Sequence, residues 1–283
     1  MTANEGKKYV FDAESATETA RLMYQGRLLT SGTQGPLSEQ TDLASIHDVL
    51  DVACGPGAWT LDVAHRWPHM QLTGVDISRT TINYARAQAE VQNLYNVAFE
   101  EMDIYQPLAF PDASFDLVNA RLLFGVLMPS QWPTFLQECR RVTRPGGIIR
   151  LTEWEIGFTN KPAMRRMLSL FTQALKLAGR TFSPDGASVG LINMLGPLLR
   201  NAGCQDVQNR AYAVDMSVGT PDSADWFQDG AIAMQMAKPL LLKTGLISEE
   251  DFDRSYQEML AEMFSDDVYS MLLLLTVWGR EPG

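Results

Sequence analysis

A short turn with two glycines behind an acidic residue is the part of this chain best suited to hold a ligand. Within residues 49–59, VLDVACGPGAW, Asp51 stands near the end of an apolar run, and Gly55 and Gly57 follow it. Glycine has no Cβ and tolerates positive φ, so this turn can bring bare backbone against a ligand. These residue types at this spacing favour the binding of a cofactor that carries a nucleoside.

Strands and a helix must position this turn. Residues 46–52 form an apolar run that predicts a strand, and apolar residues at helical spacing predict a helix over residues 58–67, whose first amides would face the ligand. A second strand over residues 70–75 leads into Asp76, about twenty residues beyond the turn, where a strand-end carboxylate reaches the hydroxyls of a ribose.

The order of residues in the turn separates two classes of nucleoside cofactor. A dinucleotide site requires G-x-G-x-x-G, whereas this chain reads D-V-A-C-G-P-G, and both Pro56 and the early Asp51 fit that pattern poorly. The stretch instead resembles motif I of the class I, Rossmann-like S-adenosylmethionine-dependent methyltransferases of the small-molecule type. Ala53 departs from the usual first glycine of that motif, and a methyl group is a mild change there.

Three further stretches resemble the same family in the same order. Residues 97–102 predict a third strand, after which Asp103 matches the acid near the adenine amino group and Ile104 the apolar residue near the ring. Residues 111–127 resemble the fourth strand and its loop, and residues 144–155 resemble the turn and fifth strand. Four landmarks in order make a chance match improbable.

The resemblance implies a fold, a cofactor and a set of cofactor-binding residues. The fold is α/β and doubly wound, with a mostly parallel seven-stranded sheet, an antiparallel last strand, and helical N-terminal and inserted lid segments. The cofactor is S-adenosyl-L-methionine, and the product is S-adenosyl-L-homocysteine. The residues expected to bind it are Asp51, Ala53, Cys54, Gly55, Pro56, Gly57, Trp59, Asp76, Ile77, Asp103, Ile104, Asn119 and Arg121.

The 283 residues are expected to form a single methyltransferase domain with additions, because they exceed what a bare seven-stranded sheet requires. Ser15 and Glu18 have the spacing of a capping box, which predicts an amphipathic helix that either covers the cofactor mouth or packs on the flank of the sheet. We divide the chain into an N-terminal helical lid (1–40), a cofactor-binding core (41–155), a helical substrate cover (156–200 and 218–267), and closing strands (201–217 and 268–283).

Composition excludes several other functions. The net charge of −11, without a dense basic run, disfavours nucleic acid as a partner. Cys54, Cys139 and Cys204 lack the spacing of a metal site or a disulfide framework, so reduced thiols and a cytoplasmic location are expected, with no metal. The longest strongly apolar stretch, residues 271–277, is too short to span a membrane, so no membrane association is expected.

The position of the histidines argues against a histidine base. His47, His65 and His69 are the only three, and none follows a strand on the expected ligand side of the sheet. The remaining candidates for a catalytic residue are Glu153, with Glu155 close to it, and Tyr24 on the N-terminal helix. The carboxylate of Glu153 could equally bond the amides of a nearby loop.

Substrate contacts are expected from four aromatic residues: Tyr24, Trp154, Phe158 and Trp226. Several roles stay open at this point. Asp51 could orient the turn or bind the methionine amino group, Asn119 could bind a ligand or cap its loop, and Arg121 could bind a substrate carboxylate or a structural acid.

The function expected from these features is methyl transfer to an O, N or C atom of a small, fairly apolar metabolite, in a pathway such as secondary metabolism. Because methyl transfer is an in-line displacement, proximity and orientation would supply most of the catalysis. The alternatives are a protein that binds S-adenosylmethionine for cyclisation, decarboxylation or sensing, and a dinucleotide oxidoreductase. The inserted helices could also form a homodimer contact.

Overall fold

The computed structural model describes residue 11 and residues 14–283, so most of the first dozen residues of the expected lid lie outside the described residues. The elements, in chain order, are α1 (Ala16–Gly32), β1 (Asp48–Val52), α2 (Ala58–Arg66), β2 (Gln71–Asp76), α3 (Arg79–Val91), β3 (Val97–Glu101), β4 (Phe115–Arg121), η1 (Leu123–Gly125), η2 (Pro129–Gln131), α4 (Trp132–Val142), β5 (Thr143–Thr159), α5 (Pro162–Leu177), α6 (Ile192–Ala202), β6 (Gln205–Asp215), α7 (Ser223–Thr244), α8 (Glu249–Met263) and β7 (Ser270–Arg280).

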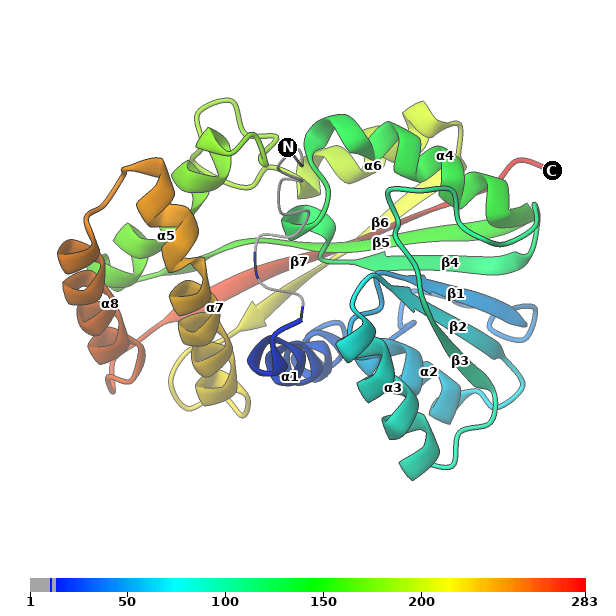
Figure 1. The fold of residues 1–283 in the computed structure, drawn as a ribbon, viewed down its shortest axis with the longest axis horizontal. Helices are drawn as coiled ribbons and strands as arrows, with labels where there is room; N and C mark the ends of the chain where they lie inside the picture. The colour runs from blue at the N-terminus through cyan, green and yellow to red at the C-terminus, as the bar shows by residue number, and fades with distance from the viewer. Residues whose placement is uncertain (1–10, 12–13) are drawn as a thin grey trace, which may run out of the picture.

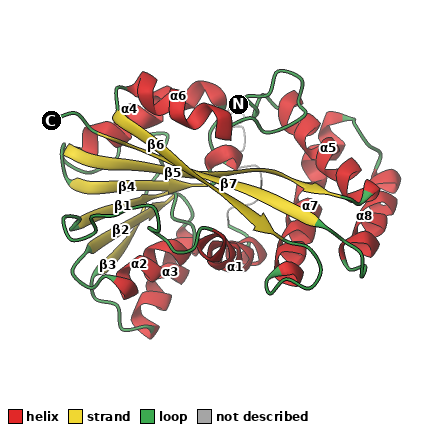
Figure 2. Cartoon of the chain, turned by 180° about the vertical axis from the view of Figure 1, so that it is seen from behind, coloured by secondary structure: helices red, strands yellow, loops and turns green. Residues whose placement is uncertain are grey.

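The seven strands form one sheet in the order β3-β2-β1-β4-β5-β7-β6. Strands β1 to β5 pair in parallel, while β7 runs antiparallel to both β5 and β6. The predicted doubly wound α/β fold with an antiparallel last strand is therefore confirmed. Figures 1 and 2 show α4 and α6 on one face of the sheet and α1, α2 and α3 on the other.

The central strand β1 is apolar on both faces because both faces are covered. Val49 packs in one cluster with Trp59 of α2, and Leu50 packs in another with Leu136 of α4. Each of these four side chains is at most 1% exposed. This double burial fixes β1, and with it the turn that follows, at the centre of the molecule.

The predicted turn at residues 144–147 lies within β5 and forms a bulge. Phe115 pairs with Thr143 whereas Leu117 pairs with Ile148, so most of residues 144–147 have no partner on β4. Gly146 has a φ of +78°, a conformation that side chains with a Cβ rarely adopt.

Strand β5 is longer than predicted. Its parallel pairing with β4 ends at Thr152, near the expected end, but its antiparallel pairing with β7 continues to Thr159. Residues 156–159 therefore belong to a strand, and the helical cover begins at α5. Figure 1 shows α5, α7 and α8 gathered around this extension of β5 and β7.

The inserted helix α8 begins with a side-chain cap, within the segment 218–267 that was expected to be helical. The Ser248 side chain accepts a hydrogen bond of 3.1 Å from the backbone N–H of Asp251, and Phe252, Met259 and Met263 are buried. None of the helices in the described part of the chain is long and apolar enough to cross a membrane.

Candidate functional site

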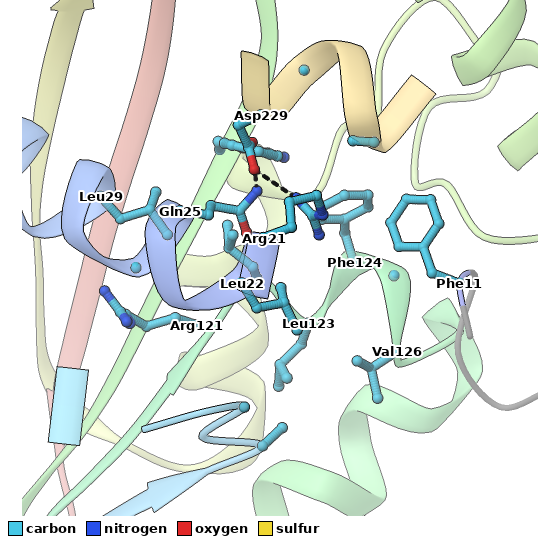
Figure 3. A pocket seen from close by; sticks show the side chains of 18 of the residues that line it. Phe11, Arg21, Leu22, Gln25, Leu29, Arg121, Leu123, Phe124, Val126 and Asp229 are labelled. Atoms are coloured by element: carbon cyan, nitrogen blue, oxygen red, sulfur yellow. Dashed lines mark hydrogen bonds and ion pairs between the residues drawn. The ribbon is translucent and has the colours of Figure 1, made fainter. Parts of the chain in front are cut away.

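A pocket of about 280 Å³ opens at the carboxyl ends of β1, β2 and β4, the place where parallel α/β sheets bind ligands. One end is formed by the predicted turn and by acidic residues at the strand ends. The other end is apolar and lies among α1, α5, α7 and α8. Figure 3 shows α1 crossing close to the mouth between the two ends.

The turn after β1 is held in left-handed conformations. Ala53, Gly55 and Gly57 have φ values of +54°, +56° and +80°. A Cβ at position 55 would meet only Leu22 of α1, at 3.9 Å, so this part of the backbone faces the pocket. Gly57 must be glycine for a different reason, because a Cβ there would lie 2.7 Å from the Phe99 ring. It packs against Phe99 and does not form the predicted contact with the ligand.

Asp76, at the end of β2, supports the turn and lines the pocket. Its Oδ2 accepts the Gly55 N–H at 2.9 Å, and its Oδ1 accepts the Ser78 N–H at 3.0 Å. Burial raises the pKa of Asp76 above its ordinary value, and the two backbone N–H groups oppose that shift. Each carboxylate oxygen has a further lone pair, so the side chain can still accept hydrogen bonds from a diol.

Asp51 is the first member of a buried polar chain that joins three strands. It accepts hydrogen bonds from Thr60 at 2.6 Å and from Asn119 at 2.8 Å. The Asn119 carbonyl in turn accepts a bond from Arg150, which pairs with Glu39 at 2.6 Å. Burial raises the pKa of Asp51. Its contacts support the orienting role, although it also forms part of the pocket wall.

The structure does not support the predicted role of Asn119 in cofactor binding. Its side chain is fully buried and bonded at both ends, to Asp51 and to Arg150, and it does not line the pocket. Its physical role is to connect β1 with β5.

Arg121, at the end of β4, has no hydrogen bond or ion pair with any of the described residues, although it lines the pocket. Burial lowers the pKa of its guanidinium to about 10, and the nearby charge of Asp51 opposes that shift. It is therefore still a cation at neutral pH. The charges of Asp51 and Asp62 act on the guanidinium, but neither acid forms an ion pair with it, so its N–H groups are available to an anionic ligand group.

Asp103, Ile104 and Ile77 line the far side of the same end of the pocket. Ile77 is 43% exposed, which is unusual for an apolar residue and places an apolar surface beside the mouth. Next to Ile104, the Tyr105 hydroxyl donates a hydrogen bond of 2.5 Å to the Val126 carbonyl, which fixes the wall there.

The apolar end contains two of the predicted substrate residues. The Trp154 ring lies 6.4 Å from that of Trp226 and 6.2 Å from that of Phe124, measured between centroids. Methionines from three helices complete this wall: Met164, Met234, Met259 and Met263. Such a surface suits an apolar ligand and can adapt to its shape.

Three other predicted residues lie away from the pocket. Tyr24 is 42% exposed, and a hydrogen bond to Asp225 raises the pKa of its hydroxyl, so it points outward from α1 and is a poor base. Phe158 is 68% exposed on the extension of β5. Trp59 is buried on the opposite face of α2, where its Nε1 donates a bond of 2.9 Å to the Pro36 carbonyl.

Glu153 is buried behind the pocket wall and does not line it. Its Oε1 accepts the Leu123 N–H at 2.5 Å, the loop contact that was the alternative to catalysis. Its Oε2 has no hydrogen-bond partner among the described residues. Burial raises the pKa of Glu153 to about 8, so the carboxyl is mostly protonated at neutral pH.

The residues that sequence reasoning missed lie on α1 and α7. Arg21, Gln25 and Asp229 all line the pocket, and Arg21 and Gln25 each donate a hydrogen bond to Asp229, as the dashed lines in Figure 3 show. A signal was present: Glu18, Arg21 and Gln25 recur at i, i+3 and i+7, which places three polar side chains on one helix face. None of the histidines lines this pocket, and the described residues contain no cluster suited to a metal ion.

Comparison with known proteins identifies relatives of this chain. Residues 49–147 match the family described as "Methyltransferase domain". The chain is 34% identical over 178 residues to the demethylmenaquinone methyltransferase of Geobacillus kaustophilus, a match that covers 58% of this chain and 73% of that protein. It is also 36% identical over 107 residues to the probable methyltransferase ltbC of Aspergillus luteorubrus, covering 36% of this chain and 38% of that protein.

A solved structure supports the fold. The phosphoethanolamine N-methyltransferase 2 of Haemonchus contortus, in complex with phosphomonomethylethanolamine and S-adenosylhomocysteine, matches 90% of this chain and 53% of that chain, with a TM-score of 0.55 and 15% identity. The chain spans about two fifths of the length of the relatives that it matches at 36% identity, 38 to 42% of each.

Proposed function

Because the chain belongs to the class I S-adenosylmethionine-dependent methyltransferases, we propose that it methylates an O, N or C atom of a small, fairly apolar metabolite. One observation carries the proposal: a charged end suited to the cofactor and an apolar end with two tryptophans share a single pocket. The substrate in the name of the Geobacillus kaustophilus relative, demethylmenaquinone, is itself largely apolar.

The residues at the charged end fit S-adenosylmethionine part by part. Arg121 is an unpaired cation suited to the methionine carboxylate, and Asp76 is suited to the ribose hydroxyls. Asp103, Ile104 and Ile77 border the space for the adenine. When bound, this cofactor supplies a methyl group on a positively charged sulfur and becomes S-adenosylhomocysteine.

The chain itself contributes orientation and the exclusion of water. Helix α1 lies against the turn through Leu22, and its Gly26 packs so closely on α2 that a Cβ there would lie 2.4 Å from Ala58. Trp154 and Trp226, whose rings are tilted by 52° to each other, would border the acceptor at the apolar end. Holding two reactants at contact distance accounts for most of the rate gain that a methyl transfer needs.

Incubation with methyl-labelled S-adenosylmethionine and a fractionated metabolite extract tests the proposal. We expect label in a small molecule, with S-adenosylhomocysteine formed in equal amount. The Asp76→Ala protein serves as the control, because its cofactor site is impaired while its apolar end is intact. Label only in protein would refute a small-molecule acceptor, and cofactor binding without S-adenosylhomocysteine would indicate a non-methylating role such as cyclisation, decarboxylation or sensing.

The partners and the location of the protein stay predictions. We expect a small-molecule substrate, no nucleic acid or membrane partner, a cytoplasmic location and a role in secondary metabolism. A homodimer through the inserted helices α7 and α8 is a further prediction. Light scattering at several protein concentrations measures it, and a constant monomer mass would contradict it.

A further inference from the structure

A buried polar cluster lies where α1 meets α7 at the pocket. It consists of Glu18, Arg21 and Gln25 on α1 and Asp229 on α7, each at most 5% exposed. Arg21 donates one hydrogen bond to Asp229 at 2.9 Å, and Gln25 donates another to its second oxygen at 2.8 Å. The other two nitrogens of Arg21 bond Glu18 at 2.7 and 2.8 Å.

Two carboxylates of this cluster bond the same guanidinium. Arg21 gives two hydrogen bonds to Glu18 and one to Asp229, and Gln25 gives Asp229 a neutral one. Asp229 is thus held by a single charged hydrogen bond in an apolar wall, and burial of a carboxylate disfavours its charged form and favours the uptake of a proton.

The cluster also lies beside the cofactor end of the pocket. Leu22 and Gly26 follow Arg21 and Gln25 directly on α1. Leu22 approaches the Gly55 turn, and a Cβ on Gly26 would lie 3.6 Å from Arg121 Nη2. One side of α1 therefore contacts the cofactor cradle, while the adjacent side fixes Asp229 at the wall of the same pocket (Figure 3).

We propose that Asp229 is the catalytic base of the methyl transfer, and that the acceptor is a small apolar molecule with an acidic hydroxyl, a phenol or an enol, methylated on oxygen. This inference rests on the proposed function. A neutral amine needs no base, whereas a hydroxyl becomes a good nucleophile as its proton leaves. A carboxylate can remove that proton only from a fairly acidic hydroxyl.

The step balances within the pocket. The O–H bond of the acceptor breaks, and its proton passes to an Asp229 carboxylate oxygen. The acceptor oxygen uses the freed electron pair to bond the methyl carbon, while the electron pair of the broken carbon–sulfur bond stays on sulfur. The proton leaves Asp229 for solvent when the product departs.

Arg21 and Gln25 act as positioning residues for this base. Burial raises the pKa of Asp229 above its ordinary value, Arg21 and Gln25 lower it, and Glu18 raises it. Glu18 and Arg21 are the charged groups that face it from α1. The net effect is a carboxylate that is a stronger base than an exposed aspartate but is still held in one orientation.

The test compares wild type, Asp229→Asn and Gln25→Met in the labelling reaction. We expect the wild-type product to carry label as a methoxy group and the rate of Asp229→Asn to fall about 100-fold or more. Gln25→Met removes a neutral hydrogen bond to the same carboxylate and should lose less than 10-fold. Calorimetry with S-adenosylhomocysteine should give all three proteins the same affinity within about threefold.

Two readouts separate catalysis from a structural role. The wild-type rate should rise with pH through one ionisation that Asp229→Asn lacks, and infrared difference spectra of the two cofactor-free proteins should show the same ionisation directly. Label on nitrogen or carbon, measured on the wild type alone, overturns the inference, as does an Asp229→Asn rate equal to that of wild type. Absence of label from every small molecule contradicts the proposed function itself.

Discussion

Asp76 Oδ2 accepts a hydrogen bond of 2.9 Å from the backbone N–H of Gly55, so the carboxylate at the end of β2 holds the turn that follows β1. The same carboxylate accepts the N–H of Ser78, the N-cap of α3. One side chain thus orders two loops that border the cofactor end of the pocket and is itself part of the wall. Its removal should affect binding more than a single lost contact would suggest.

Asp76→Ala is expected to weaken binding of S-adenosylhomocysteine by at least about 1.5 to 3 kcal/mol, because a charge-assisted hydrogen bond to the ribose is lost and the Gly55 and Ser78 amides lose their acceptor. Calorimetric titration measures the affinity. Glu101→Ala is the matched control, since Glu101 pairs with Asp76 in register on β3 but is exposed and lies outside the pocket. Unchanged affinity in Asp76→Ala would contradict the assignment.

Arg121→Met is expected to weaken cofactor binding by a similar 1.5 to 3 kcal/mol while leaving the free energy of unfolding unchanged or higher. The reason is that this partly exposed guanidinium forms no hydrogen bond or ion pair with the described residues. Calorimetry and urea unfolding measure the two quantities separately.

Arg150→Met provides the contrast. Arg150 is 1% exposed and pairs with Glu39 at 2.6 Å, so its removal leaves a buried carboxylate without a counter-charge. We expect a loss of about 3 to 5 kcal/mol in the free energy of unfolding. A destabilisation of Arg121→Met equal to that of Arg150→Met would show that Arg121 has a structural partner after all.

Glu153 should make the protein less stable as the pH rises. Burial raises its folded pKa from 4.5 to about 8. A raised folded pKa contributes stability that is fully present below about pH 4.5 and is lost as the pH rises toward 8. Glu153→Gln, which is neutral, should therefore match wild type at pH 4 and exceed its free energy of unfolding by about 3 to 5 kcal/mol at pH 9.

Urea unfolding of both proteins across this range measures the difference. Glu155→Gln is the control, because the Glu155 carboxylate accepts the N–H groups of Val189 and Gly190, both at 2.9 Å. Glu155→Gln should lower the free energy of unfolding at pH 9, whereas Glu153→Gln should raise it. Parallel curves for Glu153→Gln and wild type would mean that the carboxyl is not buried as described.

Much of the sheet and the cofactor end could be predicted because their signals are local. The strands predicted over residues 46–52 and 70–75 differ from β1 and β2 by a few residues at most. Strands β1 and β2 are short apolar runs with an acid near the end, β4 ends in an arginine, and these polar residues lie at the ligand side because parallel strands end there. Asp51, Asp76 and Arg121 therefore reach one pocket from three strands.

The extension of β5 could not be predicted, because its partner is distant in sequence. Residues after Thr152 pair with β7, more than a hundred positions later. The buried face of α1 was also not predicted. Its polar side chains Arg21 and Gln25 are buried against Asp229, contrary to the usual rule that polar faces meet solvent, whereas the predicted residue Tyr24 lies on another, exposed face.

Gly57→Ala tests whether the turn after β1 is fixed by packing as well as by φ. Gly57 and Gly146 have nearly the same φ, +80° and +78°. A Cβ on Gly146 meets nothing within 4 Å, whereas one on Gly57 would lie 2.7 Å from the Phe99 ring. Gly146→Ala should cost only the backbone strain, about 1 to 2 kcal/mol in the free energy of unfolding.

Gly57→Ala should cost a further 1 to 3 kcal/mol, because overpacking forces the ring to move. Adding Phe99→Leu should recover part of that extra cost, since Phe99 is the nearest obstacle, and a double-mutant cycle isolates the recovered energy. Equal costs for Gly57→Ala and Gly146→Ala would mean that φ alone selects glycine at position 57. The turn would then owe its shape to its own backbone and not to the contact between α2 and β3.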